Sequence, residues 1–149
     1  MTTLPPILIV TDRGHFIAYR FHNGAVVEVL HHAAFNEGTD KISEIVTDQA
    51  GRFASGGTEG YRHSAAERPK MVIELESRCV RHIAEEIAKV LTGHRETWAL
   101  AAPGEINQPI LDHLSAEIQN RLHLTLPKNL VNIPSAEIPS HFLKARREA

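Results

Sequence analysis

The chain has 149 residues, a hydrophobic content of 42% and a formal net charge of -2. A domain of this length buries roughly two-thirds of its unfolded surface, so we expect one domain covering residues 1–149. The near-neutral charge argues against a disordered chain and a strongly basic nucleic-acid binder, so an RNA partner would need a local basic patch. The single cysteine, Cys79, excludes a disulfide framework within one chain and is predicted to be a buried structural thiol.

The opening of the chain, Met1 to Val10, lacks the basic segment with which an export signal begins. No apolar run approaches the ~20 residues that a helix needs to cross a bilayer. The sequence therefore predicts a cytoplasmic location and no membrane partner.

Three strands are predicted at the start of the chain. Pro6 to Thr11 holds a continuous apolar run, which is typical of a central strand buried on both faces. His15 to Phe21 alternates apolar and polar residues, as a strand with one polar face does. Asn23-Gly24 favours a type I′ turn because both central residues need positive φ, and Ala25 to Leu30 follows as the third strand. The predicted unit is a three-stranded antiparallel meander.

A long amphipathic helix is predicted from Met71 to Leu91, where apolar residues recur at steps of three or four. Pro69 is expected at or just before its first turn, because first-turn amides have no partner in the helix. Acidic residues precede basic residues at i,i+4 on the charged face, which predicts two stabilising ion pairs, Glu74 with Arg78 and Glu85 with Lys89.

The remaining elements alternate between strand and helix. The sequence predicts a strand from Thr97 to Ala102, a second amphipathic helix from Ile106 to Leu122 and a short strand from His123 to Leu126. Ser135 is expected to cap a C-terminal helix. The predicted order is β-β-β, a long loop over residues 36–69, then α-β-α-β-α, and among known architectures this is the ribonuclease-H-like order.

The search for chemical motifs gives few candidates. No nucleotide-binding loop, Cys-x-x-Cys pair or His-Glu-x-x-His motif occurs, so neither a cofactor nor a metal is predicted. The ten histidines lack the i,i+4 spacing of a helical metal site, and His31 and His32 should point to opposite faces of a strand. Asp12 ends the first strand, where ribonuclease-H-like nucleases place a metal ligand, but no converging carboxylates follow and a turn aspartate is favoured.

The loop from Asn36 to Pro69 is the unusual feature, because long loops inside small domains are commonly functional or disordered. Its glycines allow close approach of the backbone to a ligand, and its basic residues could contact phosphate. These basic residues are Arg52, Arg62, His63 and Arg68, with Lys70 just after the loop. A mobile surface loop, in which acidic residues balance the basic ones, is the alternative interpretation.

Several short segments resemble the bacterial host-attachment protein family. They are the segment Ile9 to Phe16, the strand and turn Leu100 to Gly104, and the segments Leu126 to Leu130 and Ile133 to Ile138. Proteins of this family are described as required for attachment to host cells. The family is similar in turn to the middle domain of archaeal and eukaryotic peptide release factors and Pelota, which implies a ribonuclease-H-like core.

In release factors, a loop before the long first helix carries Gly-Gly-Gln, which positions water against the peptidyl-tRNA ester. Gly56-Gly57-Thr58 lies in the corresponding loop, with threonine in place of the glutamine. The resemblance implies backbone freedom and amide donors at both glycines, a water contact at Thr58, and rRNA or tRNA phosphate contacts from the basic residues. Because a hydroxyl is shorter than a carboxamide, the substitution weakens the case for hydrolysis.

Two hypotheses follow from the sequence. The first is a release-factor-like module that binds the ribosome or tRNA, with peptidyl-tRNA hydrolysis as its possible reaction. The second is a non-catalytic module that binds protein partners and is linked indirectly to attachment to host cells. Ribosomes and tRNA recovered with the protein would favour the first hypothesis, whereas only protein partners would favour the second.

Overall fold

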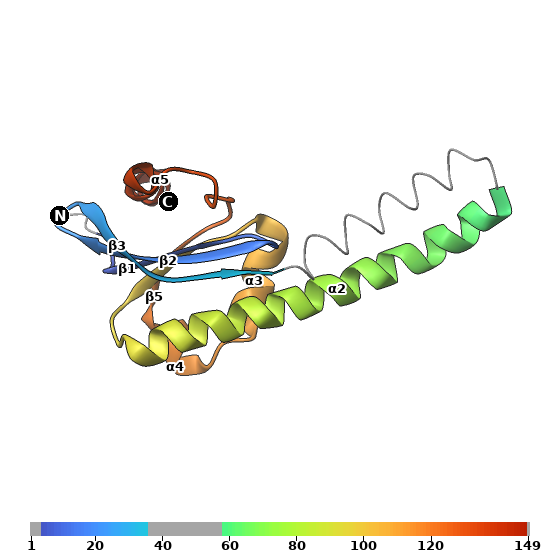
Figure 1. Ribbon diagram of the computed structural model, residues 1–149, viewed down its shortest axis with the longest axis horizontal. Coiled ribbons are helices and arrows are strands. Elements are labelled where there is room, and N and C mark those ends of the chain that lie inside the picture. Colours follow the sequence, from blue (N-terminus) through green and yellow to red (C-terminus); the bar gives the residue numbers. More distant parts are fainter. Residues whose placement is uncertain (1–3, 36–57, 149) are drawn as a thin grey trace.

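The computed structural model describes residues 4–35 and 58–148, which form a five-stranded sheet with helices on both faces (Figure 1). The first strands are β1 (Ile7–Thr11), β2 (His15–His22) and β3 (Ala25–Ala34). The later elements are α2 (Thr58–Gly93), β4 (Trp98–Ala101), α3 (Gly104–Asp112), α4 (Ala116–Arg121), β5 (Leu122–Leu126), the 3₁₀ helix η1 (Ser135–Glu137) and α5 (Ile138–Glu148). The predicted α/β class is confirmed.

The strand order in the sheet is β3-β2-β1-β4-β5. β2 runs antiparallel to both β1 and β3, whereas β1, β4 and β5 run parallel to one another. All five residues of β1 are buried, because the strand has neighbours on both sides and helices on both faces. The continuous apolar run therefore predicted a central strand correctly, and the carboxyl ends of β1, β4 and β5 lie at one edge of the sheet.

Successive residues of β1 contribute to two separate cores. Ile7 and Ile9 pack on the face covered by α2, α3 and α4, together with the fully buried Ile83 and Ile87 of α2. Residues on the opposite face pack against α5, where Phe142 is fully buried. Figure 1 shows α5 on one side of the sheet and α2, α3 and α4 on the opposite side. This two-sided burial explains why β1 carries no polar face.

The turn between β2 and β3 has the conformation that its sequence predicts. Asn23 has a φ of 52° and Gly24 a φ of 82°, and His22 pairs with Ala25 across the hairpin. Positive φ at both central residues is the requirement of a type I′ turn. β3 continues to Ala34 rather than ending at Leu30, because β2 offers pairing partners as far as His15.

The first helix begins much earlier than predicted. α2 starts at Thr58 rather than Met71, so residues 58–69 of the predicted loop are helical and Pro69 lies inside the helix. The prediction began the helix too late because Gly60 and Pro69 disfavour a helix locally. In a helix interior, a glycine costs about 1 kcal/mol and a proline about 3 kcal/mol relative to alanine. The rest of the predicted loop, residues 36–57, lies outside the described residues.

Two smaller predictions also require correction. The helix expected from Ile106 to Leu122 is divided into α3 and α4, and Ser115 caps α4 by accepting a hydrogen bond from the amide of Ile118 at 3.3 Å. Ser135 does not act as a cap, since it is the first residue of η1 and makes no side-chain capping bond there. Either serine can accept a capping hydrogen bond, so the residue type alone does not show which of the two stands directly before a helix.

The hairpin turn provides a test of the fold. We expect Gly24→Ala to lower the free energy of unfolding by about 1–2 kcal/mol, because positive φ is costly for a residue with a Cβ. No atom lies within 4 Å of the added Cβ, so the cost is one of backbone conformation. Urea unfolding measures it. Gly93→Ala is the matched control, since Gly93 also has open space but no positive φ, and equal losses in both variants would contradict the assignment.

Candidate functional site

The structure places part of the predicted site along α2. Thr58 is the first residue of this helix, and the basic positions 62, 63, 68 and 70 follow within it. Gly56, Gly57 and Arg52 lie outside the described residues. Since an α-helix rises about 1.5 Å per residue, Thr58 and Lys70 are separated by roughly 18 Å along the axis. These helical positions are therefore spread along and around the helix axis and do not converge on one point.

The N-terminal part of α2 extends beyond the sheet (Figure 1). The C-terminal part packs on the sheet, where Cys79, Val80 and Ile83 are buried in the core. Thr58 is thus at the outer end of a helix whose other end is held by the domain. The predicted burial of the Cys79 thiol is confirmed, with 1% of the residue exposed.

Arg13, in the turn between β1 and β2, connects this turn to α2 and α3. Its Nε donates a hydrogen bond to Oε1 of Glu76 on α2, and its Nη2 lies 3.6 Å from Oε2 of Glu105 on α3. The carbonyl oxygen of Arg13 accepts a hydrogen bond from Sγ of Cys79 at 3.3 Å. The guanidinium and the main chain of one residue therefore fix α2 at the point where it leaves the sheet.

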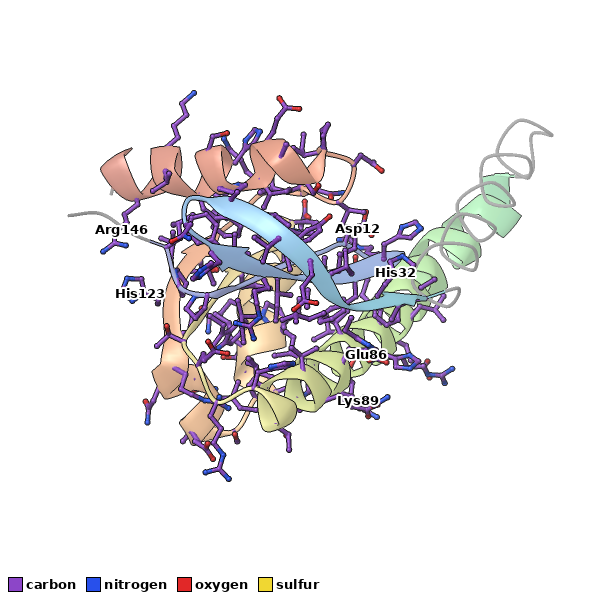
Figure 2. The ribbon with its side chains drawn as sticks, turned by 60° about the vertical axis from the view of Figure 1, so that its left-hand side comes forward. Asp12, His32, Glu86, Lys89, His123 and Arg146 are labelled. Carbon is purple, nitrogen blue, oxygen red and sulfur yellow. The ribbon has the colours of Figure 1, made fainter. Side chains whose placement is uncertain are left out.

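Asp12 gives this turn its shape. Its Oδ1 accepts hydrogen bonds from the amides of Gly14 and His15, both at 2.8 Å. Its Oδ2 accepts a bond from Nδ2 of Asn129 at 3.0 Å, which ties the turn to the segment after β5. Figure 2 shows Asp12 at the end of the sheet from which α2 extends. Because protein donors engage both oxygens, the interpretation of Asp12 as a turn aspartate is confirmed.

The same turn also holds the end of β3. The amide of Phe35 donates to the carbonyl oxygen of Gly14 at 2.8 Å, and the Phe35 ring lies 5.2 Å from the ring of His82 on α2. The turn between β1 and β2 therefore contacts both Phe35, directly after β3, and the helix α2. We refer to Asp12, Arg13, Glu76 and Asn129 as the α2 anchor.

A second connection joins β3 to α2 through a buried acid. Nε2 of His31 lies 2.7 Å from Oε2 of Glu86, and Nζ of Lys89 donates to Oε1 of Glu86 at 3.3 Å. Burial raises the pKa of Glu86, but the hydrogen bonds from His31 and Lys89 outweigh it and leave the pKa below its ordinary value. Lys89 thus forms its ion pair with Glu86 and not with Glu85, the partner that the sequence predicted. The other predicted pair, Glu74 with Arg78, is present at 2.8 Å.

The two adjacent histidines of β3 face opposite ways, as predicted. His31 reaches Glu86 on α2, whereas His32 is paired with Ile17, which packs on the α5 face of the sheet. Figure 2 shows Glu86 and Lys89 on α2, with His32 on the strand above them. Among the side chains that the structure describes, no three His, Cys, Asp or Glu residues converge as a metal site would require.

Membership of a family follows from comparison with known proteins. A family model described as "Protein required for attachment to host cells" matches residues 7–142. The chain belongs to this host-attachment family. No curated protein matches the chain. The host-attachment match extends from the first residue of β1 to Phe142 of α5, so it includes all five strands and the whole α2 anchor.

The anchor of this host-attachment family protein includes residues that the sequence did not single out. Arg13 and Glu76 are 63 positions apart, and Asp12 and Asn129 are 117 apart, so no local pattern pairs them. The residue types of Asp12-Arg13-Gly14 predict a turn, but they do not predict that Glu76 and Asn129 bind its side chains. In the part of the chain that the structure describes, no helix is both long and apolar enough to cross a membrane.

Asp12 provides a test of the anchor. We expect Asp12→Ala to lower the free energy of unfolding by about 1–3 kcal/mol, because two amides and the Asn129 side chain lose their acceptor. Asp112→Ala is the control, since Asp112 accepts one exposed side-chain bond from Gln108 and its loss should change stability by less than about 0.5 kcal/mol. Denaturant unfolding that gives the same loss for both variants would contradict the role of Asp12.

Glu86 provides a pH-dependent test. A carboxyl whose pKa is lowered on folding stabilises the protein above its unfolded pKa, and this contribution is lost as pH falls through the folded pKa. We therefore expect Glu86→Gln to cost about 1 kcal/mol near neutral pH, where the charge-assisted bonds are lost, and progressively less below about pH 4.5. Thermal unfolding across pH 3 to 8 measures the effect.

The exposed neighbour Glu85 gives the matched control for this test. Glu85→Gln removes the same charge from the same turn of α2 without removing a partner of His31 or Lys89. Its stability should follow the wild-type pH curve closely. Parallel curves for the two variants would show that the Glu86 bonds do not contribute as inferred.

Proposed function

We propose that this host-attachment family protein is a release-factor-like module that binds the ribosome or tRNA through the outer part of α2. The observation that carries the proposal is the position of Thr58, the first residue of a helix that extends beyond the sheet. Gly56 and Gly57 directly precede it in the sequence. A glycine pair at the entrance to a projecting helix is suited to reach into a site that the body of the domain cannot enter.

The sheet supports the architectural half of the proposal. Its order, β3-β2-β1-β4-β5, combines two antiparallel pairings around β2 with parallel pairings of β1, β4 and β5. A ribonuclease-H-like core, which the resemblance to release factors implies, has this combination. We propose that the domain is such a core, with α2 as the helix that follows the Gly-Gly segment.

The basic residues supply the proposed contacts with RNA. Arg62, His63, Arg68 and Lys70 lie along the outer part of α2, and Arg52 precedes it in the sequence. Contacts to phosphate need no single pocket, because successive phosphates are themselves spread along a nucleic-acid chain. Basic positions spread along a helix are therefore compatible with RNA binding, and a cytoplasmic location is part of the proposal.

Hydrolysis of peptidyl-tRNA is a separate question from binding. A release-factor glutamine offers a carboxamide with two donors and one acceptor oxygen, whereas Thr58 offers a shorter hydroxyl with a single donor. We therefore propose binding as the function and treat hydrolysis as a reaction to be assayed. If the activity is present on stalled ribosomes, Gly57→Ala should reduce it, and unchanged activity would remove this segment from the mechanism.

Co-sedimentation with purified ribosomes at moderate salt tests the binding proposal. We expect the wild type to sediment with ribosomes and Arg62→Glu/Arg68→Glu to bind at least about tenfold more weakly, because phosphate contacts become repulsive. The matched control is Arg81→Glu/Arg95→Glu, which makes the same change of charge at exposed positions nearer the sheet. Failure of the wild type to sediment, or an equal loss in the control, would overturn the proposal.

A second candidate function is a non-catalytic protein-interaction module, and the edge strand β3 favours it. Val27 and Val29 are each 55% exposed on this strand, which has a sheet neighbour on one side. An edge strand with apolar side chains can pair with a strand of a partner. Under this alternative, Val27→Lys/Val29→Lys should abolish capture of protein partners, and ribosomes should be absent from the captured material.

A further inference from the structure

A pocket with a volume of about 560 Å³ lies between the end of β5 and α5. Its wall is formed by residues 125–128 at the end of β5 and by Ser140, His141, Lys144 and Ala145 of α5. Figure 1 shows α5 on the face of the sheet opposite α2. The edge strand β5 ends beside this pocket at Leu126. The volume falls within the range of small-molecule sites, which is roughly 300–1,000 Å³.

The wall of this pocket combines positive charge with an apolar surface. Lys128 and Lys144 line it together with His141, and Leu126 and Ala145 supply apolar area. None of the described residues that line it is acidic. Lys89 has an ion pair with Glu86, but neither pocket lysine has a carboxylate partner among the described side chains. Two ammonium groups beside one cavity therefore lack a compensating negative charge.

The hydroxyl groups of the pocket are already used within the protein. Oγ1 of Thr125 donates to Oδ1 of Asn107 at 2.8 Å, and Oγ of Ser140 donates to the carbonyl oxygen of Glu137 at 2.8 Å. Each hydroxyl has a single proton, so neither is free to donate to a ligand without breaking its bond. Recognition of a ligand consequently depends on the two lysines and the histidine.

We propose that this pocket binds a phosphomonoester with an apolar or aromatic body, such as a nucleoside monophosphate. The two charges of a phosphate dianion match the two ammonium groups, whereas a single carboxylate would leave one of them uncompensated. Lysine binds phosphate as a point charge, and the arginine fork that favours carboxylates does not line the pocket. Leu126 and Ala145 would contact the body of the ligand. The proposal does not depend on RNA binding by α2, because the two sites use different residues on opposite faces.

Titration followed by amide resonances tests this site, with adenosine 5′-monophosphate, inorganic phosphate and adenosine as probes. We expect saturable shifts at residues 125–128 and 140–145, with the monophosphate binding more tightly than either of the other probes. Lys128→Ala/Lys144→Ala should weaken binding of the monophosphate by about tenfold or more, because two charge-assisted contacts are lost. Both substitutions are at exposed positions, so the fold should be retained.

Lys89→Ala is the control, since it removes one lysine from the opposite side of the sheet and should leave the affinity for the monophosphate unchanged. Three results would overturn the proposal. They are the absence of saturable shifts at the pocket, equal affinity for adenosine and the monophosphate, and undiminished binding by the double lysine variant. Ribosome binding by that variant is measured separately, so loss of one activity without the other distinguishes this site from the proposed function of α2.

Discussion

The carboxylate of Asp12 fixes the geometry on which the rest of the domain depends. Its Oδ1 accepts hydrogen bonds from the amides of Gly14 and His15, which close a tight turn between the buried strand β1 and its neighbour β2. This turn orients Arg13 toward Glu76 and presents backbone oxygens to Cys79 and Phe35. One side chain thus organises the point at which β1, β3, α2 and the segment after β5 meet.

Elements that depend on local physical chemistry were predictable from the sequence. Asn23-Gly24 specified its turn because positive φ is an intrinsic preference of these residues. The continuous apolar run of β1 specified a central strand, since such a run is stable only with both faces covered. The apolar spacing after Met71 likewise predicted the part of α2 that packs on the sheet. In each case the responsible residues are neighbours in sequence or lie one helical turn apart.

Features that depend on distant partners were not predictable. The contacts of Arg13 with Glu76 and of Asp12 with Asn129 cross most of the chain, and the sequence contains no pattern that pairs them. The early start of α2 was missed because Gly60 and Pro69 reduce helix propensity locally. The choice of Glu86 over Glu85 as partner of Lys89 depends on burial against β3, which requires knowledge of the sheet. The assignment of the site residues stays a prediction, and the sequence did not predict that positions 58, 62, 63, 68 and 70 lie on one helix.

The length of α2 has a mechanical consequence. At about 1.5 Å per residue, Thr58 lies roughly 27 Å along the axis from Glu76. The outer part of α2 can therefore act as a lever that pivots at the α2 anchor. A force applied at the tip would exert its greatest torque on the contacts of Arg13 with Glu76 and Cys79. Those contacts lead directly to the central strand β1. A force on the outer end of α2 would therefore be transmitted through these contacts to the centre of the sheet.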